Sequence, residues 1–195
     1  MEKKLLETTL IGDKVSLEPL KITHKNELLK AASDGELWNL WVTSVPSEKT
    51  IDTYLNRALA DYELGLALPF VVKLQATGEI IGSTRYCNID SNNRRLEIGY
   101  TWYAKSYQRT GVNTECKFLL LRQAFEVLNC IAVEFKTHWY NTASRNAILR
   151  LGAKQDGVLR NHRIDEEGNI RDSVVFSIIR EKWGTVKKNL QFKMK

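Results

Sequence analysis

The sequence predicts a mixed α/β fold in which helices flank a central β-sheet, and three observations lead to this prediction. Several runs alternate between apolar and polar residues, which is the period of a β-strand. Other runs place apolar residues at helical spacing. One strand-like run also leads through a glycine-containing loop into such a helix, and a further strand-like run follows it.

The N-terminal part of the predicted fold is a short strand followed by two helices. Residues 14–20 alternate as a strand, and residues 23–32 form a helical stretch. Residues 47–64 form the second helix, with Ser47 as its expected N-cap and Gly65 just past its end.

Three antiparallel strands are expected next, because β-rich runs follow one another across short polar turns. A helix, a strand and a second amphipathic helix come after them, and two final strands surround a turn at residues 167–169. The expected bounds, in chain order, are 68–74, 79–89 and 94–103 for the three strands, 112–128 for the helix, 131–137 for the strand, 141–151 for the second helix, and 158–164 and 171–179 for the final strands.

Length and charge narrow the classes of protein. With 195 residues, the chain is expected to form a single domain over residues 1–195. Its net charge of +6 would suit a polyanionic partner, a nucleotide cofactor or merely a basic surface, and the basic tail at 181–195 is expected to be a solvated face. A nucleic-acid partner is disfavoured, because neither a recognition helix nor an aromatic stacking platform interleaved with basic residues is evident.

Cysteine usage and hydropathy predict a cytoplasmic protein. Cys87, Cys116 and Cys130 form no C-x-x-C pair and adjoin no histidine cluster, so neither a disulfide framework nor a metal site is expected. The N-terminus lacks the apolar stretch of a signal peptide, and no later segment has the length of a membrane span. We therefore expect a soluble protein without a membrane partner.

The segment at residues 108–115 is a candidate phosphate site, because it leads from a strand to the start of a helix. The first N–H groups of a helix point outward together, and the helix dipole adds partial positive charge there. Arg109 can add a charged donor, and Gly111 permits a positive φ or a close approach of the ligand. The alternative is an ordinary helix start.

This loop resembles the acetyl-CoA motif of the GNAT superfamily, Gln/Arg-x-x-Gly-x-Gly/Ala. Gln108, Arg109 and Gly111 occupy matching positions, whereas Asn113 replaces the last small residue. Further stretches resemble the branch related to the Rim-type ribosomal-protein N-terminal acetyltransferases, and the resemblance covers about residues 14–183, the expected core of the domain. These stretches are Glu97-Ile98-Gly99-Tyr100, Asn141-x-x-Ser144 and Leu151-Gly152-Ala153.

The resemblance implies a GNAT-like, mostly antiparallel and twisted sheet of about seven strands, splayed between strands 4 and 5. Strand 4 carries Glu97 and strand 5 carries Lys136, and in the family the pantetheine arm of acetyl-CoA threads the gap between these strands. The residues that this implies for binding acetyl-CoA are Thr101, Trp102, Tyr103, Gln108, Arg109, Thr110, Gly111, Val112, Asn113, Thr114, Asn141 and Ser144.

The implied reaction is transfer of an acetyl group from acetyl-CoA to a primary amine by direct attack in a ternary complex. The amine must lose a proton and the departing thiolate must gain one. The resemblance implies Glu97 as the base, often through water, and Ser144 as the acid, with Tyr140 as a competing acid. A backbone N–H near Thr101 or Trp102, freed by a bulge, would stabilise the oxyanion.

Each candidate has a structural alternative. Glu97 could be a half-exposed strand residue that pairs with Arg94 or Arg95, and Ser144 could merely support the helix start at Asn141. The amine could belong to a small molecule or to a protein N-terminus, and a homodimer is a habit of the family. A non-catalytic module that senses acyl-CoA is the alternative function.

Three further side chains are candidates for contact with a substrate. Trp38 and Trp41 lie in a stretch that looks like a loop, so they are expected either to pack in the core or to form a lid on the acceptor side. His138 comes just after a predicted strand and is a candidate contact for substrate or cofactor.

Overall fold

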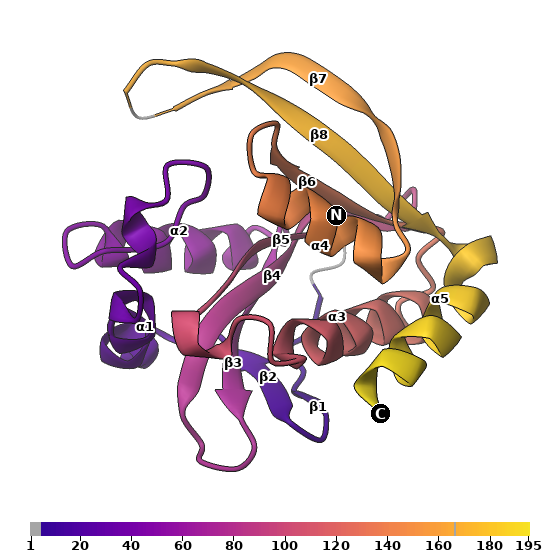
Figure 1. The fold of residues 1–195 in the computed structure, drawn as a ribbon, viewed down its shortest axis with the longest axis horizontal. Coiled ribbons are helices and arrows are strands. Elements are labelled where there is room, and N and C mark those ends of the chain that lie inside the picture. Colours follow the sequence, from indigo (N-terminus) through magenta and orange to yellow (C-terminus); the bar gives the residue numbers. More distant parts are fainter. Residues whose placement is uncertain (1–4, 166) are drawn as a thin grey trace.

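The computed structural model describes residues 5–165 and 167–195, and in these ranges one sheet carries helices on both faces (Figure 1). The sheet has eight described strands in the order β1-β2-β3-β4-β5-β6-β8-β7, where about seven were expected, and the mixed α/β prediction is confirmed. The strands are β1 (Leu10–Ile11), β2 (Val15–Pro19), β3 (Leu68–Leu74), β4 (Ile80–Asp90), β5 (Arg95–Tyr103), β6 (Ala132–His138), β7 (Lys154–Ile164) and β8 (Ile170–Ile179). The α-helices are α1 (Lys25–Ser33), α2 (Ile51–Glu63), α3 (Val112–Arg122), α4 (Thr142–Leu151) and α5 (Arg180–Met194).

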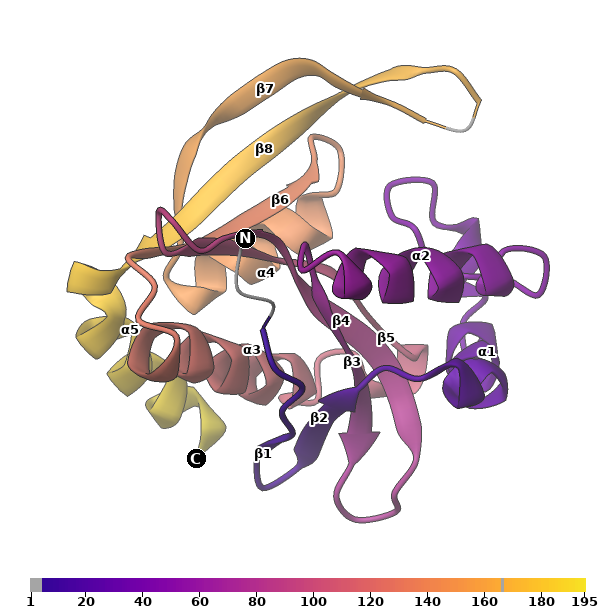
Figure 2. The same ribbon diagram turned by 180° about the vertical axis from the view of Figure 1, so that it is seen from behind.

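Strand β3 explains why helices cover both faces of the sheet. Phe70 and Val72 belong to the apolar cluster that includes α3, α4 and α5, whereas Val71 belongs to the cluster that includes α1 and α2. Successive side chains of a strand point to opposite faces, so these two groups of helices lie on opposite sides. The view from behind shows α2 in front of the sheet (Figure 2).

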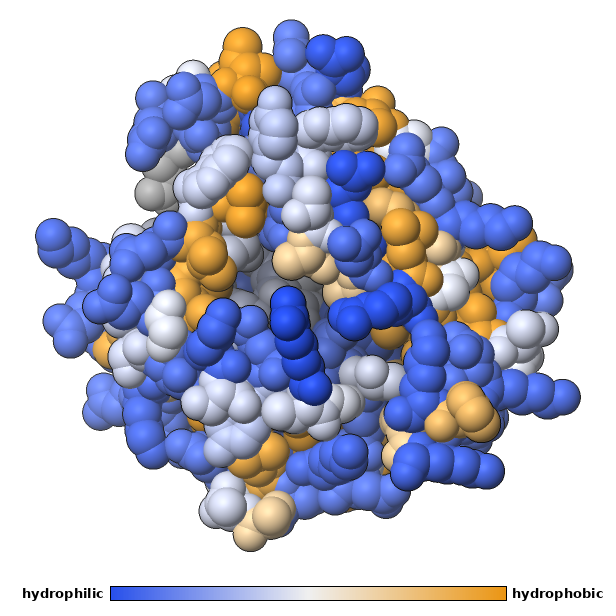
Figure 3. Space-filling view, viewed as in Figure 1, coloured by the Kyte–Doolittle hydropathy of each residue, from blue (hydrophilic) through white to orange (hydrophobic). Residues whose placement is uncertain are grey.

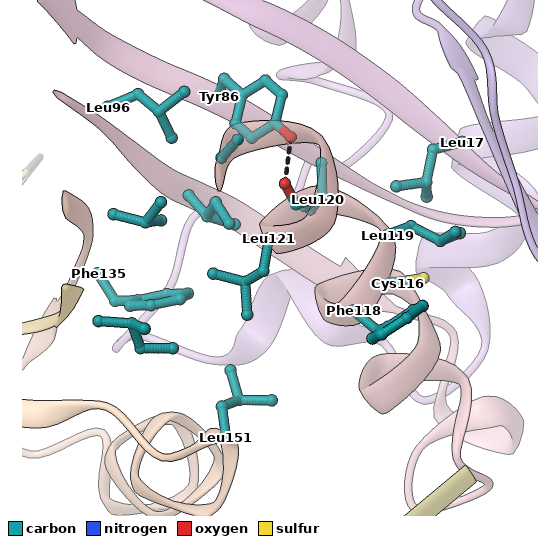
Figure 4. Packing of buried hydrophobic residues seen from close by; sticks show 14 of the residues in the cluster. Leu17, Tyr86, Leu96, Cys116, Phe118, Leu119, Leu120, Leu121, Phe135 and Leu151 are labelled. Carbon is teal, nitrogen blue, oxygen red and sulfur yellow. Dashed lines mark hydrogen bonds between the residues drawn. The ribbon is translucent and has the colours of Figure 1, made fainter. Parts of the chain in front are cut away.

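The larger cluster lies between the sheet and α3 (Figure 4). Leu119, Leu120 and Leu121 are all buried in it. The Tyr86 hydroxyl of β4 donates to the Leu120 carbonyl at 2.6 Å, close to the point where α3 gives way to the π-helical turn Gln123–Val127. This buried bond fixes the position of α3 along β4.

The sheet is antiparallel except where β5 meets β6. These two strands pair in parallel over three residue pairs, Arg95↔Ala132, Leu96↔Val133 and Glu97↔Glu134. No further β5–β6 pair follows, so the C-terminal part of β5 separates from β6. The expected splay between the strand that carries Glu97 and the strand that carries Lys136 is therefore confirmed.

A buried carboxylate attaches the N-terminal end of α3 to the turn between β1 and β2. Glu115 accepts hydrogen bonds from the backbone N–H groups of Asp13 (2.9 Å), Lys14 (2.8 Å) and Val15 (2.9 Å). A Cβ on Gly12 would lie 2.8 Å from the Glu115 carboxyl carbon, so this turn has no room for a side chain at that position. The turn and the helix thereby position each other.

Two elements begin four residues away from their predicted starts. Helix α2 begins at Ile51 rather than at Ser47, because residues 47–50 form a turn in which the Ser47 N–H donates to Thr50 Oγ1 at 2.9 Å. Strand β7 begins at Lys154, four residues before the expected start at 158, because its polar first residues still pair with β8.

The basic C-terminal tail is not a wholly solvated segment. It forms α5, which buries Trp183, Val186 and Leu190 against the core, and the Trp183 indole N–H donates to Glu126 at 2.9 Å. The prediction of a solvated face therefore holds only for the outer side of α5. None of the helices in the described ranges has the length and apolar character to cross a bilayer.

The Glu115 contact leads to a stability prediction. Glu115→Gln replaces an acceptor of three N–H groups by an amide whose NH₂ cannot accept, so we expect the free energy of unfolding to fall by about 2 kcal/mol. Urea denaturation measures this change, with the exposed Glu48→Gln as the control. Equal stability of the two variants would contradict the role given to Glu115.

Candidate active site

The loop before α3 presents a row of unpaired backbone donors. Arg109 has φ 64° and Gly111 has φ 91°, and these left-handed residues turn the chain into the helix. Within the described chain, the N–H groups of residues 109–114 donate to no protein acceptor, and the first bond of the helix runs from the Glu115 N–H to the Gly111 carbonyl at 3.1 Å. Such a row at a helix N-terminus is suited to a phosphate.

Side chains of the same loop are used to hold it in place. Gln108 Nε2 donates to the Tyr103 carbonyl at 3.1 Å, and Thr110 Oγ1 donates to the Tyr107 carbonyl at 2.7 Å. The Tyr103 hydroxyl donates to Asn113 Oδ1 at 3.2 Å. Asn113, the departure from the expected small residue, thus anchors the loop to β5.

A β-bulge interrupts β5 where it leaves β6. Gly99 faces Arg85 and Trp102 faces Ser83, so β5 has one more residue than β4 between these pairs. Tyr100 lies in the bulge with φ 51°. The expected bulge is therefore present at Tyr100 and Thr101, immediately before Trp102, and a bulge leaves one residue outside the regular ladder.

A hollow marks the same region on the surface. Figure 3 shows it near the middle of the face that carries α3 and α4, between α4 and the loop that leads into α3, with strongly hydrophilic side chains at its border. The loop that carries the unpaired N–H groups and α4 therefore border one depression (Figure 3).

Glu97 lies on the sheet face opposite α3, and it is not the half-exposed strand residue of the alternative interpretation. Only 6% of the residue is exposed, and it pairs with neither Arg94 nor Arg95. Its Oε2 atom accepts from Lys136 Nζ at 3.0 Å and from Asn88 Nδ2 at 2.8 Å. No hydrogen bond to Oε1 is found among the described residues, so this oxygen remains available to an incoming group.

Lys136 joins the carboxylates on either side of the junction between β5 and β6. Its Nζ also lies 3.2 Å from Glu134, which contacts Arg95 as well. Burial opposes a charged Lys136, but the negative charges of Glu97 and Glu134 and their hydrogen bonds raise the pKa of Lys136 above its ordinary value. The lysine is therefore a stable cation whose charge is matched.

The start of α4 supplies the other polar group of the candidate site. Asn141 caps this helix by accepting the Ser144 N–H at 2.9 Å, and Gly152 ends the helix with φ 102°. The Ser144 side chain is half-buried, and its hydroxyl makes no hydrogen bond within the described chain. Ser144 therefore supports the start of the helix through its backbone N–H, and its hydroxyl stays free for another role.

Aromatic side chains connect the loop between α1 and α2 to the end of β6. The Trp41 and His138 ring centroids lie 4.9 Å apart, and those of Trp41 and Tyr140 lie 6.0 Å apart. Tyr140 is largely exposed, and its backbone N–H donates to His138 Nδ1 at 3.0 Å. Burial and the charge of Arg171 lower the pKa of His138, so its imidazole is neutral at neutral pH.

The tryptophans divide between packing and surface positions. Trp38 packs against the apolar cluster that includes α1 and α2, so of its two expected roles the structure shows packing. Trp41 is 67% exposed and its ring contacts His138 at the end of β6, and its role as a lid stays a prediction. Trp102 is buried and its indole N–H donates to the Tyr54 hydroxyl at 3.3 Å, so its side chain belongs to the core.

The structure also brings functional groups to the site that the sequence analysis missed. Lys117 of α3 is buried, and its Nζ donates to Oγ1 of Thr101, a bulge residue, at 2.6 Å. Arg85 and Arg171 reach the opposite face of the sheet near Tyr100. The sequence held one signal for Lys117 and Arg85, because each is a charged residue at an inward position of an apolar run. Burying a charge is costly, so such a position can mark a functional residue.

Comparisons with known proteins agree with this geometry. Residues 14–154 match the family described as acetyltransferase (GNAT) domain. The chain is 28% identical over 145 residues to the Bacillus subtilis (strain 168) protein named "Putative ribosomal N-acetyltransferase YdaF", which covers 73% of this chain and 78% of the relative. These matches confirm the resemblance drawn from the loop and from the downstream motifs.

Solved structures share the fold over nearly the whole chain. The crystal structure of a GCN5-related N-acetyltransferase from Brucella melitensis has a TM-score of 0.88 and 28% identity, covering 99% of this chain and 88% of that one. Mycobacterium smegmatis RimJ in complex with CoA-disulfide has a TM-score of 0.76 and 21% identity, covering 92% of this chain and 88% of that one.

The buried lysine leads to a prediction about pH. Burial lowers the pKa of Lys117 from 10.5 to about 8, so between these values the unfolded chain binds more protons than the folded one and stability rises with pH. We expect Lys117→Met to raise the free energy of unfolding by about 2 kcal/mol at pH 7, and this gain to shrink towards pH 10. Urea denaturation at both pH values, with the exposed Lys188→Met as control, measures it. A gain that does not change with pH would contradict the explanation.

Proposed function

The chain belongs to the GNAT acetyltransferase family as an N-acetyltransferase, and we propose that it transfers an acetyl group from acetyl-CoA to a primary amine by direct attack in a ternary complex. The observation that carries the proposal is the row of unpaired N–H groups at residues 109–114, beside the splay between β5 and β6. This combination offers an anion site and a slot that leads from it to Glu97.

The loop and the splay have chemistry that fits the two ends of acetyl-CoA. The N–H groups of residues 109–114, with the exposed Arg109 guanidinium, would hold the pyrophosphate. The pantetheine arm would lie in the gap between β5 and β6, near Asn141 and Ser144 of α4. Thr101, Trp102 and Tyr103 line this gap through their backbone, since their side chains are committed to contacts within the fold.

Each proposed catalytic group has a defined task. The amine nitrogen attacks the thioester carbonyl carbon while Glu97 Oε1 takes the amine proton, directly or through a water molecule. An N–H group freed by the bulge at Tyr100 stabilises the oxyanion. The C–S bond then breaks, and the Ser144 hydroxyl gives a proton to the thiolate while it takes one up from a solvent water molecule. Tyr140 is the competing acid, and its place beside Trp41 and His138 favours a role in covering the acceptor instead.

Loss of the proposed base tests the reaction. We expect Glu97→Gln to lower kcat by about 100-fold or more, because an amide cannot accept the amine proton, while the KM for acetyl-CoA stays unchanged. The measurement is release of free CoA thiol from acetyl-CoA in the presence of a panel of amines, amino acids and N-terminal peptides.

Glu134→Gln is the matched control, because it also removes a carboxylate from Lys136 but lies outside the proposed proton path. Equal kcat values for the two variants would overturn the role of Glu97. Binding of acetyl-CoA without release by any amine would replace the proposed activity with the acyl-CoA sensor.

The anion loop can be tested separately from catalysis. Gly111 has a positive φ, which a residue with a Cβ adopts only with strain, and a Cβ there would lie 3.2 Å from Lys14 Nζ. Gly111→Ala is therefore expected to distort the loop and weaken acetyl-CoA binding by about 10-fold. Gly168→Ala is the control, since Gly168 also has a positive φ but lies in the β7–β8 turn. Isothermal titration gives both Kd values, and equal Kd values would contradict the assignment of the loop.

A further inference from the structure

Four basic side chains gather on the face of the sheet that carries Glu97. Arg85 comes from β4, Lys136 from β6, Arg163 from β7, and Arg171 from β8, where it faces Arg163 across the hairpin. The charges of Arg85, Lys136 and Arg163 all act on the Cys87 thiol, and those of Arg163, Lys136 and Arg171 act on the His162 imidazole. The four cations therefore share one neighbourhood.

Arg85 is a buried cation whose one ion pair among the described residues is long. Only 2% of the residue is exposed, and its guanidinium carbon lies 4.0 Å from the centre of the Tyr100 ring, in the bulge. Its Nε has no hydrogen-bond acceptor in the described part of the chain. The Asp61 carboxylate is 3.8 Å from its Nη1, which is longer than a hydrogen bond. A buried charge with so little compensation is costly to the fold.

Arg171 repeats this pattern at the edge of the same region. It is half-buried, its Nε is buried without an acceptor, and no carboxylate oxygen of the described residues lies within ion-pair distance. Burial and the adjacent charge of Arg163 lower the pKa of Arg171. Like charges placed directly across a strand pair destabilise it, so folding alone does not favour this arrangement.

The neighbouring carboxylates are committed to other partners. Glu97 and Glu134 form ion pairs with Lys136, and Asp172 forms one with Arg160. Asp165 accepts the backbone N–H groups of the hairpin turn. The excess positive charge of this face therefore resides on the three arginines.

We propose that the amine accepted at this site also carries an anionic group, a carboxylate or a phosphate, which binds the Arg171 and Arg163 guanidinium groups below the β7–β8 hairpin. Two guanidinium groups offer the planar pairs of donors that match either anion. Arg85 adds its weakly compensated charge from beneath Tyr100 and holds that ring at the bulge. This inference rests on the proposed acetyl transfer and names the chemical class of its acceptor.

The proposal separates two groups of acceptors. Amino acids and phosphorylated amines would be accepted, because their anionic group compensates the arginines. Polyamines, aminoglycosides and lysine-rich N-termini would be repelled by the same charges. The amine would then lie between the arginines on one side and the thioester at the bulge on the other, within reach of Glu97.

Matched acceptors test the charge requirement directly. We would measure CoA release with 4-aminobutyrate against 4-aminobutanamide, and with O-phosphoethanolamine against ethanolamine and spermidine. We expect kcat/KM to be about 10-fold or more higher for an anionic member than for its neutral partner. The two pairs distinguish a carboxylate from a phosphate. Equal or better use of the neutral or cationic amines would overturn the inference and leave the acetyl transfer standing, whereas no release with any amine would overturn the transfer itself.

Variants of the hairpin locate the anion site. Arg171→Gln is expected to raise the KM of the anionic acceptor by about 10-fold and to leave the KM values of its neutral partner and of acetyl-CoA unchanged. Arg160→Gln is the matched control, because Arg160 lies on the same hairpin with a side chain that is 79% exposed and paired with Asp172. If Arg171→Gln affects both acceptors equally, Arg171 is not the anion site. Arg171 is only half-buried, so we expect Arg171→Gln to fold. The test therefore needs no substitution of the buried Arg85.

Discussion

The candidate site depends on one junction, the parallel pairing of β5 with β6 over three residue pairs. This junction joins the antiparallel strands β1–β5 to the unit formed by β6, β8 and β7. Lys136 strengthens it by contacting a carboxylate on each strand, Glu97 and Glu134. If the pairing continued further, the strands would close the slot, and if it were absent, the two halves of the sheet would lose their common register.

The splay matters because it connects the two faces of the sheet, which have different chemistry. On the face with α3 and α4, backbone N–H groups at residues 109–114 offer partial positive charge without a titratable group. On the other face, arginines from β4, β7 and β8 supply full charges. Both faces favour anions, and the only uncommitted carboxylate oxygen near the slot belongs, among the described residues, to Glu97. A base flanked by two cationic regions is suited to an amine whose substituents are acidic.

The local features of the site could be predicted from the sequence because they depend on neighbouring residues. The glycine before α3, the Asn141 cap and the Gly152 end of α4 follow from backbone preferences over a few positions. The bulge at Thr101 was expected from the family resemblance rather than from a local signal. The two errors have different causes. The solvated tail was wrong because Trp183 contacts Glu126, 57 residues earlier in the chain, whereas the start of α2 is set by the local contact between Ser47 and Thr50.

The sequence by itself determined the succession of strands and helices, the anion loop and the family, because periodicity, capping residues and short motifs are properties of contiguous residues. Only the tertiary structure decided which charges meet. Glu97 pairs with Lys136 rather than with Arg94 or Arg95, although Lys136 lies far along the chain. Arg171 is placed opposite Arg163 by the register of the hairpin and near Tyr100 by the way the hairpin crosses the sheet. Electrostatic interactions depend on distances in space, which sequence separation does not specify.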